Sequence, residues 1–186
     1  MNAPRIVSDE DDETLALQAK GGSARAFEAL IERHYMTIYR FAYRYAGNQR
    51  DAEDVTQEVC VKLAGALGTF KGNSKFTSWL YTVTTRTAID WSRAQGRHDR
   101  RAVAIDPELT GEGANAERAL HSKQILERLQ DLKEDERTAL LLVFVEELSH
   151  KEAAQVMGTA ESTVSWKIHE ARKALKAAGL LTEGGV

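Results

Sequence analysis

The fold is decided by residues 148–168, which read LSHKEAAQVMGTAESTVSWKI. Ser149 precedes a short helix and Glu152 follows it by three positions, which is the pattern of a capping box at a helix N-terminus. Gly158 stands where the chain must turn sharply, because glycine adopts a positive φ at little steric cost. A second helix begins near Glu161, with apolar residues at helical spacing on its buried face. The stretch therefore predicts a helix-turn-helix.

The second helix of this motif is expected to turn its hydrogen-bonding side chains outward. Polar residues at the N-terminal end of such a helix are what a reader of the DNA major groove needs. The alternative is a helical hairpin whose outward face is only solvated. The outward residues are Ser162, Thr163, Ser165, Trp166, Lys167 and His169.

Length and composition favour a helical protein without a membrane anchor. The 186 residues leave room for one large or two small domains, and only two of them are prolines. No apolar run approaches the ~18 residues of a membrane span, and the acidic residues 9–13 are unlike a signal peptide. We therefore expect a cytoplasmic protein without membrane insertion. The single cysteine, Cys60, excludes an internal disulfide and a cysteine-rich zinc site, and it is expected to be a small core residue.

The distribution of charge fits DNA binding better than the net charge of −3 does. Five arginines and two aspartates between residues 86 and 101 give a local charge of +3, and four cations against two acids give +2 over residues 161–176. Acidic clusters at the N-terminus and over residues 51–58 offset these patches. The pattern suits a protein that contacts DNA at two places and a basic protein surface at a third. Few phosphate contacts imply weak DNA binding by the chain alone.

The periodicity predicts an all-α chain of two small helical domains joined by a flexible linker. Residues 1–12 are acidic, lack periodicity and are expected to be disordered. Residues 13–96 are expected to form the first domain, with a short helix and a long amphipathic one up to about residue 46. A helix capped by Asp51 and a helix over about residues 75–97 complete that domain.

Apolar periodicity stops over residues 97–115, where proline and glycine indicate a linker. The second domain is expected over residues 116–180 and contains the helix-turn-helix at its end. A helix over residues 134–145 precedes that motif, and its apolar run at residues 140–145 is expected to be buried on several sides. Residues 181–186 are a tail.

With both domains assigned, the chain resembles the extracytoplasmic-function sigma factors, the small two-domain members of the bacterial RNA polymerase sigma family. Three motifs carry the resemblance over roughly residues 16–180. Residues 51–59, DAEDVTQEV, are similar to the family's polymerase-binding helix, and residues 70–80, FKGNSKFTSWL, to its promoter-melting loop. The third motif runs from Asp135 through the helix-turn-helix to Leu175. Three motifs in order, at the family's spacing, are a specific signal.

The resemblance implies that the acidic helix docks on a basic coiled coil in the largest subunit of core RNA polymerase. Complementary charge there speeds and orients association. Without the resemblance, a solvated acidic face would be the preferred interpretation. The residues implied in docking are Asp51, Asp54, Gln57 and Glu58.

The resemblance also implies that the loop over residues 69–76 captures a base flipped from the non-template strand of the −10 element. Extruding a base costs about a few kcal/mol, so a site that binds only the extruded base favours strand opening. The aromatic residues nearby are Phe70, Phe76, Trp79 and Tyr81, of which Trp79 is expected to pack in the core together with Leu80. The implied −10 contacts are Lys71, Asn73, Ser74, Lys75, Arg86, Arg93 and Arg97.

The helix-turn-helix is implied to read the −35 element as duplex, where base contacts specify sequence and phosphate contacts position the helix. Arg86 stands where the family often has asparagine, and Ser165 and Lys167 stand where it often has arginine. These departures leave the promoter sequence open. The implied −35 contacts are Ser162, Thr163, Ser165, Trp166, Lys167, His169, Arg172 and Lys173.

The sequence contains no constellation that predicts catalysis. Paired carboxylates, a Ser/His/Asp set and a phosphate-binding loop are all missing, and the five histidines have no metal-ligand spacing. We therefore expect neither catalytic residues nor a metal or cofactor, and the polymerase would carry the catalysis. The expected partners are core RNA polymerase, promoter DNA and, by resemblance, an anti-sigma protein.

Two alternatives remain open. One is a conventional regulator that binds operators as a dimer, which predicts tight duplex binding without polymerase. The other is a helical adaptor that mimics a sigma factor and sequesters an anti-sigma protein, which predicts a degenerate DNA-facing surface.

Overall fold

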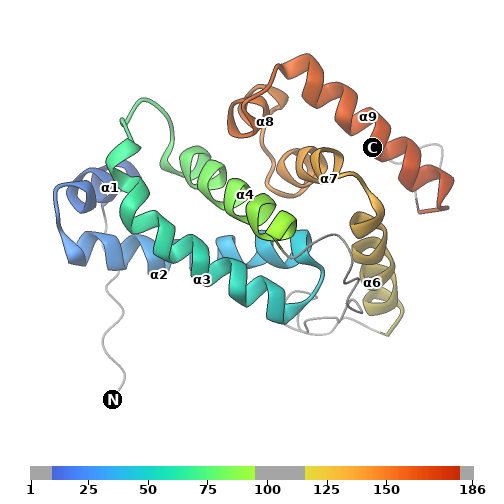
Figure 1. Cartoon of the computed structure of the whole chain (residues 1–186), viewed down its shortest axis with the longest axis horizontal. Coiled ribbons are helices and arrows are strands. Elements are labelled where there is room, and N and C mark those ends of the chain that lie inside the picture. Colours follow the sequence, from blue (N-terminus) through green and yellow to red (C-terminus); the bar gives the residue numbers. More distant parts are fainter. Residues whose placement is uncertain (1–9, 95–115, 181–186) are drawn as a thin grey trace.

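The computed structural model describes residues 10–94 and 116–180, with the backbone alone for residues 116–122. The described residues are helical, without a strand, and form two groups of helices that lie side by side (Figure 1). The first group comprises α1 to α4 and the second α6 to α9, so the prediction of two all-α domains is confirmed. The segment expected to be a linker, residues 97–115, and the tail at residues 181–186 lie outside the described residues.

Side chains and a glycine set the ends of the helices in the first domain. Asp11 and Ser23 accept hydrogen bonds from the backbone N–H groups three residues on, which caps the first two helices. Gly47 ends the second helix with a φ of 83°. The helices are α1 (Asp12–Lys20), α2 (Ala24–Ala46), α3 (Gln49–Ala66) and α4 (Phe76–Ala94), with a 3₁₀ turn at Leu67–Thr69 before α4.

The predicted cap of α3 is wrong. Asn48, not Asp51, caps this helix, because Asn48 Oδ1 accepts a hydrogen bond from the backbone N–H of Asp51 at 3.0 Å. Asn48 Nδ2 in turn donates to Asp51 Oδ2 at 2.8 Å. Asparagine and aspartate are equally good caps, so a pattern that has both, three residues apart, fits either.

The predicted disorder of residues 1–12 is wrong for residues 10–12. Asp11 caps α1, and Asp12 forms an ion pair with Arg33 and a hydrogen bond with His34, both of α2. The acidic run therefore begins the first helix instead of preceding it. Residues 1–9 lie outside the described part of the chain.

The core of the first domain lies among α2, α3 and α4 and is rich in aromatic rings. α1 covers one end of it with Leu15 and Ala16. Cys60 is half-buried against this core, in line with its predicted packing role, and burial raises the pKa of its thiol. Burying each large side chain contributes about 1.5–3 kcal/mol. The most deeply buried are Ile38, Phe41, Tyr43, Tyr45, Val55, Val59, Phe70, Phe76 and Leu80.

The helix-turn-helix of the second domain is confirmed in its local details. Both hydrogen bonds of the capping box between Ser149 and Glu152 are present, and Gly158 turns the chain with a φ of 65°. The buried face of the second helix consists of Val164, Ile168, Ala171 and Leu175. The helices of this domain are α6 (Ala116–Asp131), α7 (Glu134–Leu140), α8 (His150–Met157) and α9 (Glu161–Ala177).

The apolar run before the helix-turn-helix differs from the prediction. α7 ends at Leu140, and a π-helical turn, Leu141–Val145, follows it. Its wider hydrogen bond runs from the N–H of Glu146 to the carbonyl of Leu141 at 3.1 Å. Leu141 and Leu142 are fully buried, whereas Phe144 is 45% exposed. The run is therefore fully buried only at Leu141 and Leu142, while Val143 and Val145 are half-buried against the core.

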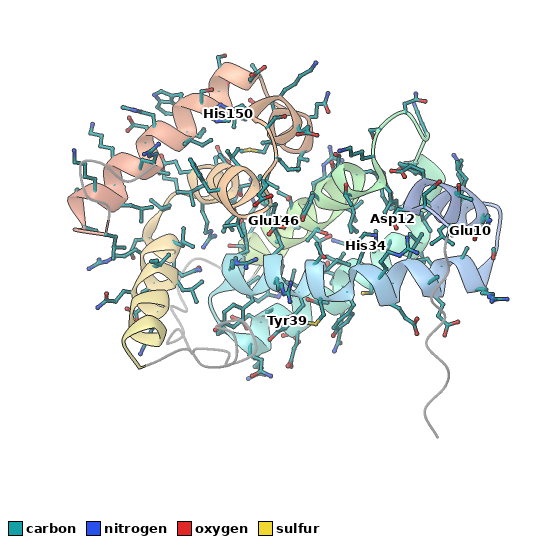
Figure 2. All side chains as sticks on the ribbon, turned by 180° about the vertical axis from the view of Figure 1, so that it is seen from behind. Glu10, Asp12, His34, Tyr39, Glu146 and His150 are labelled. Carbon is teal, nitrogen blue, oxygen red and sulfur yellow. The ribbon has the colours of Figure 1, made fainter. Side chains whose placement is uncertain are left out.

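The two domains share one continuous cluster of buried apolar residues, and polar contacts lie beside it, around Glu146 (Figure 2). Glu146, after the π-helical turn, accepts a hydrogen bond from the Tyr81 hydroxyl of α4 and lies 3.5 Å from Arg44 Nη1 of α2. Gln130 of α6 donates to the carbonyl of Tyr45 at 3.1 Å. α8 packs along α4 beside this junction, so the second domain covers part of α4.

Candidate polymerase and promoter interfaces

Asp51, one of the four predicted polymerase contacts, faces inward. It is 5% exposed, and its carboxylate accepts the hydrogen bond from Asn48 described above. Its carboxylate therefore binds the residue that caps the N-terminus of α3. The other three predicted contacts make up the outer acidic face of this helix.

Asp54, Gln57 and Glu58 lie at three- and four-residue steps, so they share one stripe of α3. Asp54 and Gln57 are exposed, and Glu58 Oε1 lies 2.8 Å from Lys62 Nζ. Val61 continues the stripe one turn further and is 76% exposed, more than any other large hydrophobic residue in the described part of the chain. Sequence reasoning missed Val61, although its spacing of seven residues from Asp54 was visible. We call these four residues the α3 stripe.

The predicted base-capturing loop is exposed between two buried ends. Phe70 and Phe76 are 1% and 2% exposed, and their rings meet edge to face with centroids 5.7 Å apart. The two rings close the base of the loop, so neither can stack on an extruded base. Trp79 packs against both rings and donates its indole N–H to Thr69 Oγ1 at 3.3 Å, in line with its predicted core role. The exposed residues are Lys71, Gly72, Asn73, Ser74 and Lys75.

The basic residues of α4 are spaced by seven, which places them on one face. Arg86 is exposed, and Arg93 Nη2 lies 2.7 Å from Glu134 Oε1 at the start of α7. Asp90, between the two arginines on the same face, reduces the positive charge there. The third predicted arginine, Arg97, lies outside the described residues.

The outer face of α9 carries the predicted −35 contacts, and three of them contact other residues of the domain. Arg172 lies over the ring of Phe144, 5.9 Å from its centroid. Lys167 Nζ lies 2.7 Å from Asp135 Oδ2 of α7, and Ser165 Oγ lies 2.8 Å from His150 Nδ1 of α8. Trp166 is 53% exposed, and Lys167 lies beside its ring. Thr163 is half-buried, and the remaining exposed positions are Ser162, His169, Arg172 and Lys173.

Carboxylates of the second domain thus oppose cations predicted to face DNA. Hydrogen bonds at the N-terminus of α8 chiefly lower the pKa of Glu152, and the charge of Lys75 in the loop lowers it further. Two predicted DNA-facing cations, Arg93 and Lys167, therefore have acidic partners in the second domain. Phosphates would have to replace these groups.

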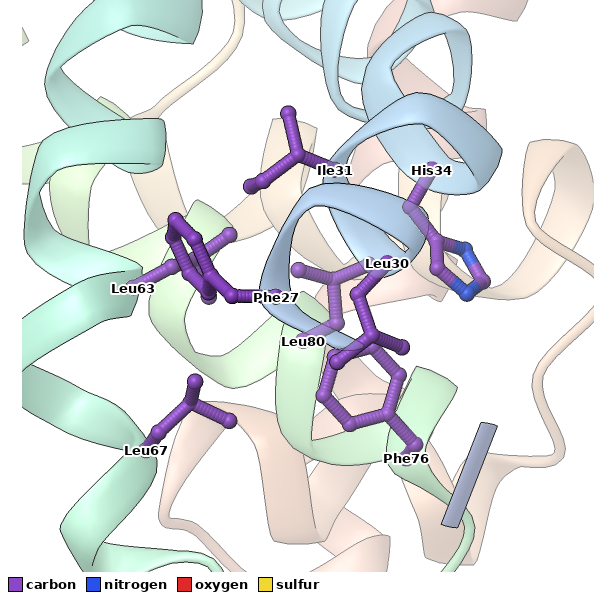
Figure 3. A pocket seen from close by; sticks show the side chains of 8 residues that line it. All are labelled: Phe27, Leu30, Ile31, His34, Leu63, Leu67, Phe76 and Leu80. Carbon is purple, nitrogen blue, oxygen red and sulfur yellow. The ribbon is translucent and has the colours of Figure 1, made fainter. Parts of the chain in front are cut away.

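The cavity among the helices of the first domain is too small for a ligand. It lies among α2, α3 and α4 and measures about 10 Å³ (Figure 3), which leaves room for about one water molecule at most. In the described ranges, no three His, Cys, Asp or Glu side chains are grouped to hold a metal. None of the helices described is both long and apolar enough to cross a bilayer. The cavity is lined by Phe27, Leu30, Ile31, His34, Leu63, Leu67, Phe76 and Leu80.

Comparison with known proteins identifies both domains. Residues 30–98 match the family described as Sigma-70 region 2, and residues 122–175 match Sigma-70, region 4. The RNA polymerase sigma-H factor of Pseudomonas aeruginosa is 33% identical over 183 residues, which cover 91% of this chain and 94% of that protein. The ECF RNA polymerase sigma-E factor of Escherichia coli is 31% identical over 176 residues, covering 88% and 92%.

A solved structure extends the similarity to the whole arrangement of helices. CnrH, solved in complex with the cytosolic domain of CnrY, matches with a TM-score of 0.69 at 28% identity, covering 91% of this chain and 97% of CnrH. Both family matches, the relatives of similar length and this shared architecture agree. The chain belongs to the extracytoplasmic-function sigma factors of bacterial RNA polymerase.

Proposed function

We propose that this sigma factor is a dissociable promoter-specificity subunit in which each candidate interface has one partner. The α3 stripe binds the coiled coil in the largest subunit of core RNA polymerase. The loop over residues 71–75 and the basic face of α4 bind the −10 element, and the outer face of α9 binds the −35 element. The polymerase carries the catalysis, and the chain acts in the cytoplasm without a metal or cofactor of its own.

The loop over residues 71–75 is the observation that carries this proposal. Five exposed residues, two of them lysines, project between two phenylalanines that are fixed in the core. Such a loop presents small polar groups to a base that has left the duplex. Because a base stacked in the duplex cannot reach the same groups, binding at the loop favours strand opening.

The exposed face of α9 supports the role at the −35 element. Ser162 and Trp166 lie four residues apart in the first turns of the helix, where a recognition helix meets base edges. The apolar body of Trp166 suits contact with a thymine methyl group. Arg172 and Lys173, further along, suit phosphates, which position the helix without reading sequence.

Promoter binding requires the two domains to separate. α8 lies along α4, and the ion pair of Arg93 with Glu134 of α7 joins the two domains and occupies a cation that a phosphate would otherwise bind. An anti-sigma protein holds the chain inactive by covering its polymerase- and DNA-binding surfaces. The similar protein CnrH was solved with a partner, the cytosolic domain of CnrY.

Charge reversal on the α3 stripe tests the polymerase contact. Asp54→Lys combined with Glu58→Lys replaces attraction to a basic coiled coil by repulsion, so affinity for core polymerase should fall by about tenfold or more. Transcription that depends on the chain should be lost with it. The melting temperature should stay unchanged, because both side chains lie on the surface.

Glu127→Lys on α6 is the matched control. Glu127 is a surface glutamate paired with Lys123 four residues away, much as Glu58 is paired with Lys62. This variant should bind core polymerase like the wild type. A folded double-reversal variant with wild-type affinity for core polymerase would show that the docking face is wrong. Tight duplex binding that needs no polymerase would favour the operator-binding regulator.

A further inference from the structure

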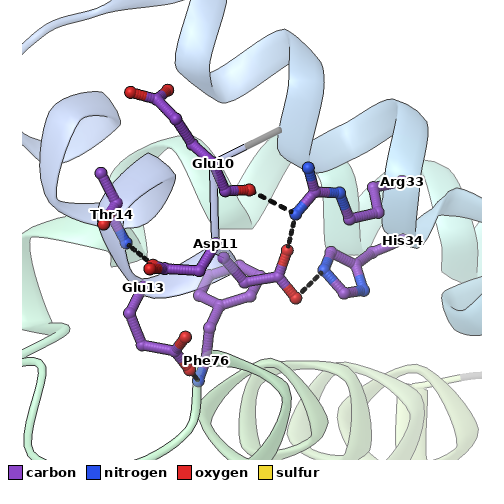
Figure 4. A network of polar contacts seen from close by, with 8 residues as sticks. Glu10, Asp11, Glu13, Thr14, Arg33, His34 and Phe76 are labelled. Carbon is purple, nitrogen blue, oxygen red and sulfur yellow. Dashed lines mark hydrogen bonds and ion pairs between the residues drawn. The ribbon is translucent and has the colours of Figure 1, made fainter. Parts of the chain in front are cut away.

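α1 contacts both ends of the loop over residues 71–75. Lys20 Nζ donates a hydrogen bond to the backbone carbonyl of Phe70 at 2.7 Å. Glu13 Oε1 accepts one from the backbone N–H of Phe76 at 2.7 Å (Figure 4). One helix therefore holds the last backbone group before the loop and the first one after it.

A third residue of α1 lies near the middle of the loop. Both δ carbons of Leu17 are 4.0 Å from the position that a Cβ on Gly72 would take, and Gly72 has a φ of 71°. Glu13, Leu17 and Lys20 are spaced by four and three residues, so they share one face of the helix. Glu13 contacts the residue after the loop, Leu17 lies near its middle, and Lys20 contacts the residue before it. We call these three residues the α1 stripe.

Glu13 takes the place of a local helix cap. α4 begins at Phe76, and the preceding residue, Lys75, has no side-chain acceptor for the free N–H groups of the first turn. The carboxylate of Glu13 accepts from one of these groups, although it lies 63 residues earlier in the chain. A negative charge at a helix N-terminus is also favourable because of the helix dipole. Loss of Glu13 would release the end of the loop.

α1 is itself tied to α2. Asp12 forms an ion pair with Arg33 and a hydrogen bond with His34, and Arg33 Nη1 also donates to the backbone carbonyl of Glu10 at 3.1 Å (Figure 4). The ring of His34 packs against that of Phe76 with centroids 5.4 Å apart. The α1 stripe is therefore presented from a fixed base, and not from a loose terminal segment.

We propose that the α1 stripe is a positioning device for recognition of the −10 element, which rests on the function proposed for the loop. The ring contact between Phe70 and Phe76 fixes the side chains that flank the loop, whereas Glu13 and Lys20 fix the backbone of the same two residues. Fixing both ends narrows the conformations of the five exposed residues before DNA arrives. A preorganised loop discriminates better, because less ordering opposes binding of the correct base.

The test compares the rates of open-complex formation by the holoenzyme on two promoters. One is a promoter that the wild-type chain uses, and the other differs from it by one base at the most discriminating −10 position. Glu13→Ala and Lys20→Met should each lower the ratio of the two rates by about two- to tenfold, the effect of one lost hydrogen bond. Affinity for core polymerase and for −35 duplex should stay at the wild-type values.

Conservative variants separate positioning from a general loss of structure. Glu13→Gln keeps an acceptor and Lys20→Arg keeps a donor, so both should restore discrimination. Gln18→Ala is the matched control, because Gln18 is on α1 but donates to Glu10 at 2.9 Å and not to the loop. It should leave discrimination unchanged.

Three results would overturn the proposal. Glu13→Ala and Lys20→Met could retain wild-type discrimination, Gln18→Ala could lose as much as they do, or affinity for core polymerase could fall in parallel. In each case a wild-type holoenzyme that discriminates leaves the function of the loop intact. A wild-type holoenzyme that initiates without any preference at the −10 element would contradict the function proposed for the loop, and this proposal with it.

Discussion

At the scale of single residues, burial and a neighbouring carboxylate have opposite effects on the pKa of His34. It is 8% exposed, and its Nε2 lies 2.9 Å from Asp12 Oδ2. Burial lowers the pKa of His34, and this effect outweighs the opposite one of the Asp12 carboxylate. The charge of Arg33 lowers the pKa further and that of Glu13 raises it. The folded chain therefore binds a proton at this residue less readily than the unfolded chain does.

Acidification should destabilise the first domain through His34. As the pH falls through about 6.5, the ordinary pKa of histidine, the unfolded chain takes up a proton that the folded chain still refuses, so the free energy of unfolding decreases. The loss should be complete below the lowered pKa of the folded state. Chemical unfolding between pH 7.5 and 5.5 should show a steeper decrease for the wild type than for His34→Gln.

The comparison with His34→Gln isolates this residue from other groups that titrate. Burial raises the pKa of Glu146, which contributes stability that is lost as the pH rises, the opposite sign, but it does so equally in both proteins. Equal slopes for the wild type and His34→Gln would contradict the account of His34.

Residue types alone could not have assigned several of these roles. Asp51 and Asp54 are both acidic and three residues apart, yet one is 5% exposed and the other lies outward. Phe70 and Phe76 flank an exposed loop in the sequence, but their rings pack on each other. In each case the outcome depends on what surrounds the side chain in three dimensions.

At the scale of elements, the turn of the helix-turn-helix depends on the backbone of Gly158. Its φ of 65° is a conformation that other residues adopt only with strain, and a Cβ there would meet nothing within 4 Å. Gly158→Ala should therefore destabilise the second domain by about 1 kcal/mol through the backbone alone. Affinity for −35 duplex should fall with it, because the turn sets the angle of α9.

Gly65→Ala is the matched control for this prediction. Gly65 lies inside α3, and a Cβ there also meets nothing within 4 Å, but its φ is not positive. Since alanine is the better helix former, this variant should be more stable by up to about 1 kcal/mol. Chemical unfolding measures both changes, and equal effects of the two substitutions would contradict the explanation.

Local signals predicted the elements that local contacts stabilise. Ser149, Glu152 and Gly158 act within a few residues of themselves, and all three behave as the sequence indicated. The start of α4 could not be predicted in this way, because its partner, Glu13, lies 63 residues away. The π-helical turn at Leu141–Val145 was missed for a related reason: apolar periodicity does not reveal a change in hydrogen-bond register.

At the scale of the whole molecule, the junction between domains places ionisable groups in partial burial. Burial raises the pKa of Glu146, while the Tyr81 hydrogen bond and the charge of Arg44 act in the opposite direction. Burial also raises the pKa of Tyr81, and the hydrogen bond to Glu146 raises it further. Partly buried charged pairs of this kind contribute little net stability, because the cost of removing the groups from water offsets most of their attraction. These polar pairs therefore add little to the contact between the domains, which also share one continuous apolar cluster.

Neutralising the acids that face DNA-binding cations should strengthen DNA binding by the free chain. Glu134→Gln with Asp135→Asn removes the partners of Arg93 and Lys167. Exposed ion pairs contribute roughly 0.2–1 kcal/mol each, so the loss of two of them should raise affinity for promoter duplex by about two- to thirtyfold. Fluorescence anisotropy at low salt measures the change.

Glu127→Gln with Asp131→Asn on α6 is the control for net charge. It changes the charge by the same two units, but the cations beside these acids, Lys123 and Arg128, lie on α6 itself. An equal gain in affinity for both double variants would mean that only the overall field has changed, and that the domains do not shield their own DNA-binding cations.

The sequence predicted two helical domains but not their contact. The periodicity of each helix reports which face is buried, not which domain buries it. Glu146 lies 65 positions from Tyr81 and 102 positions from Arg44 in the sequence. No short sequence motif indicates either contact. The role of Arg93 as a partner of Glu134 was hidden for the same reason.

The most direct test of the sigma-factor account is transcription in vitro from a library of random promoters, with purified core polymerase in the presence and absence of the chain. The account predicts discrete start sites that appear only with the chain and share a −35 and a −10 element. The Asp54→Lys, Glu58→Lys variant should abolish them. No dependence on the folded chain, with core polymerase that responds to a control sigma factor, would contradict the account and favour an adaptor that sequesters an anti-sigma protein.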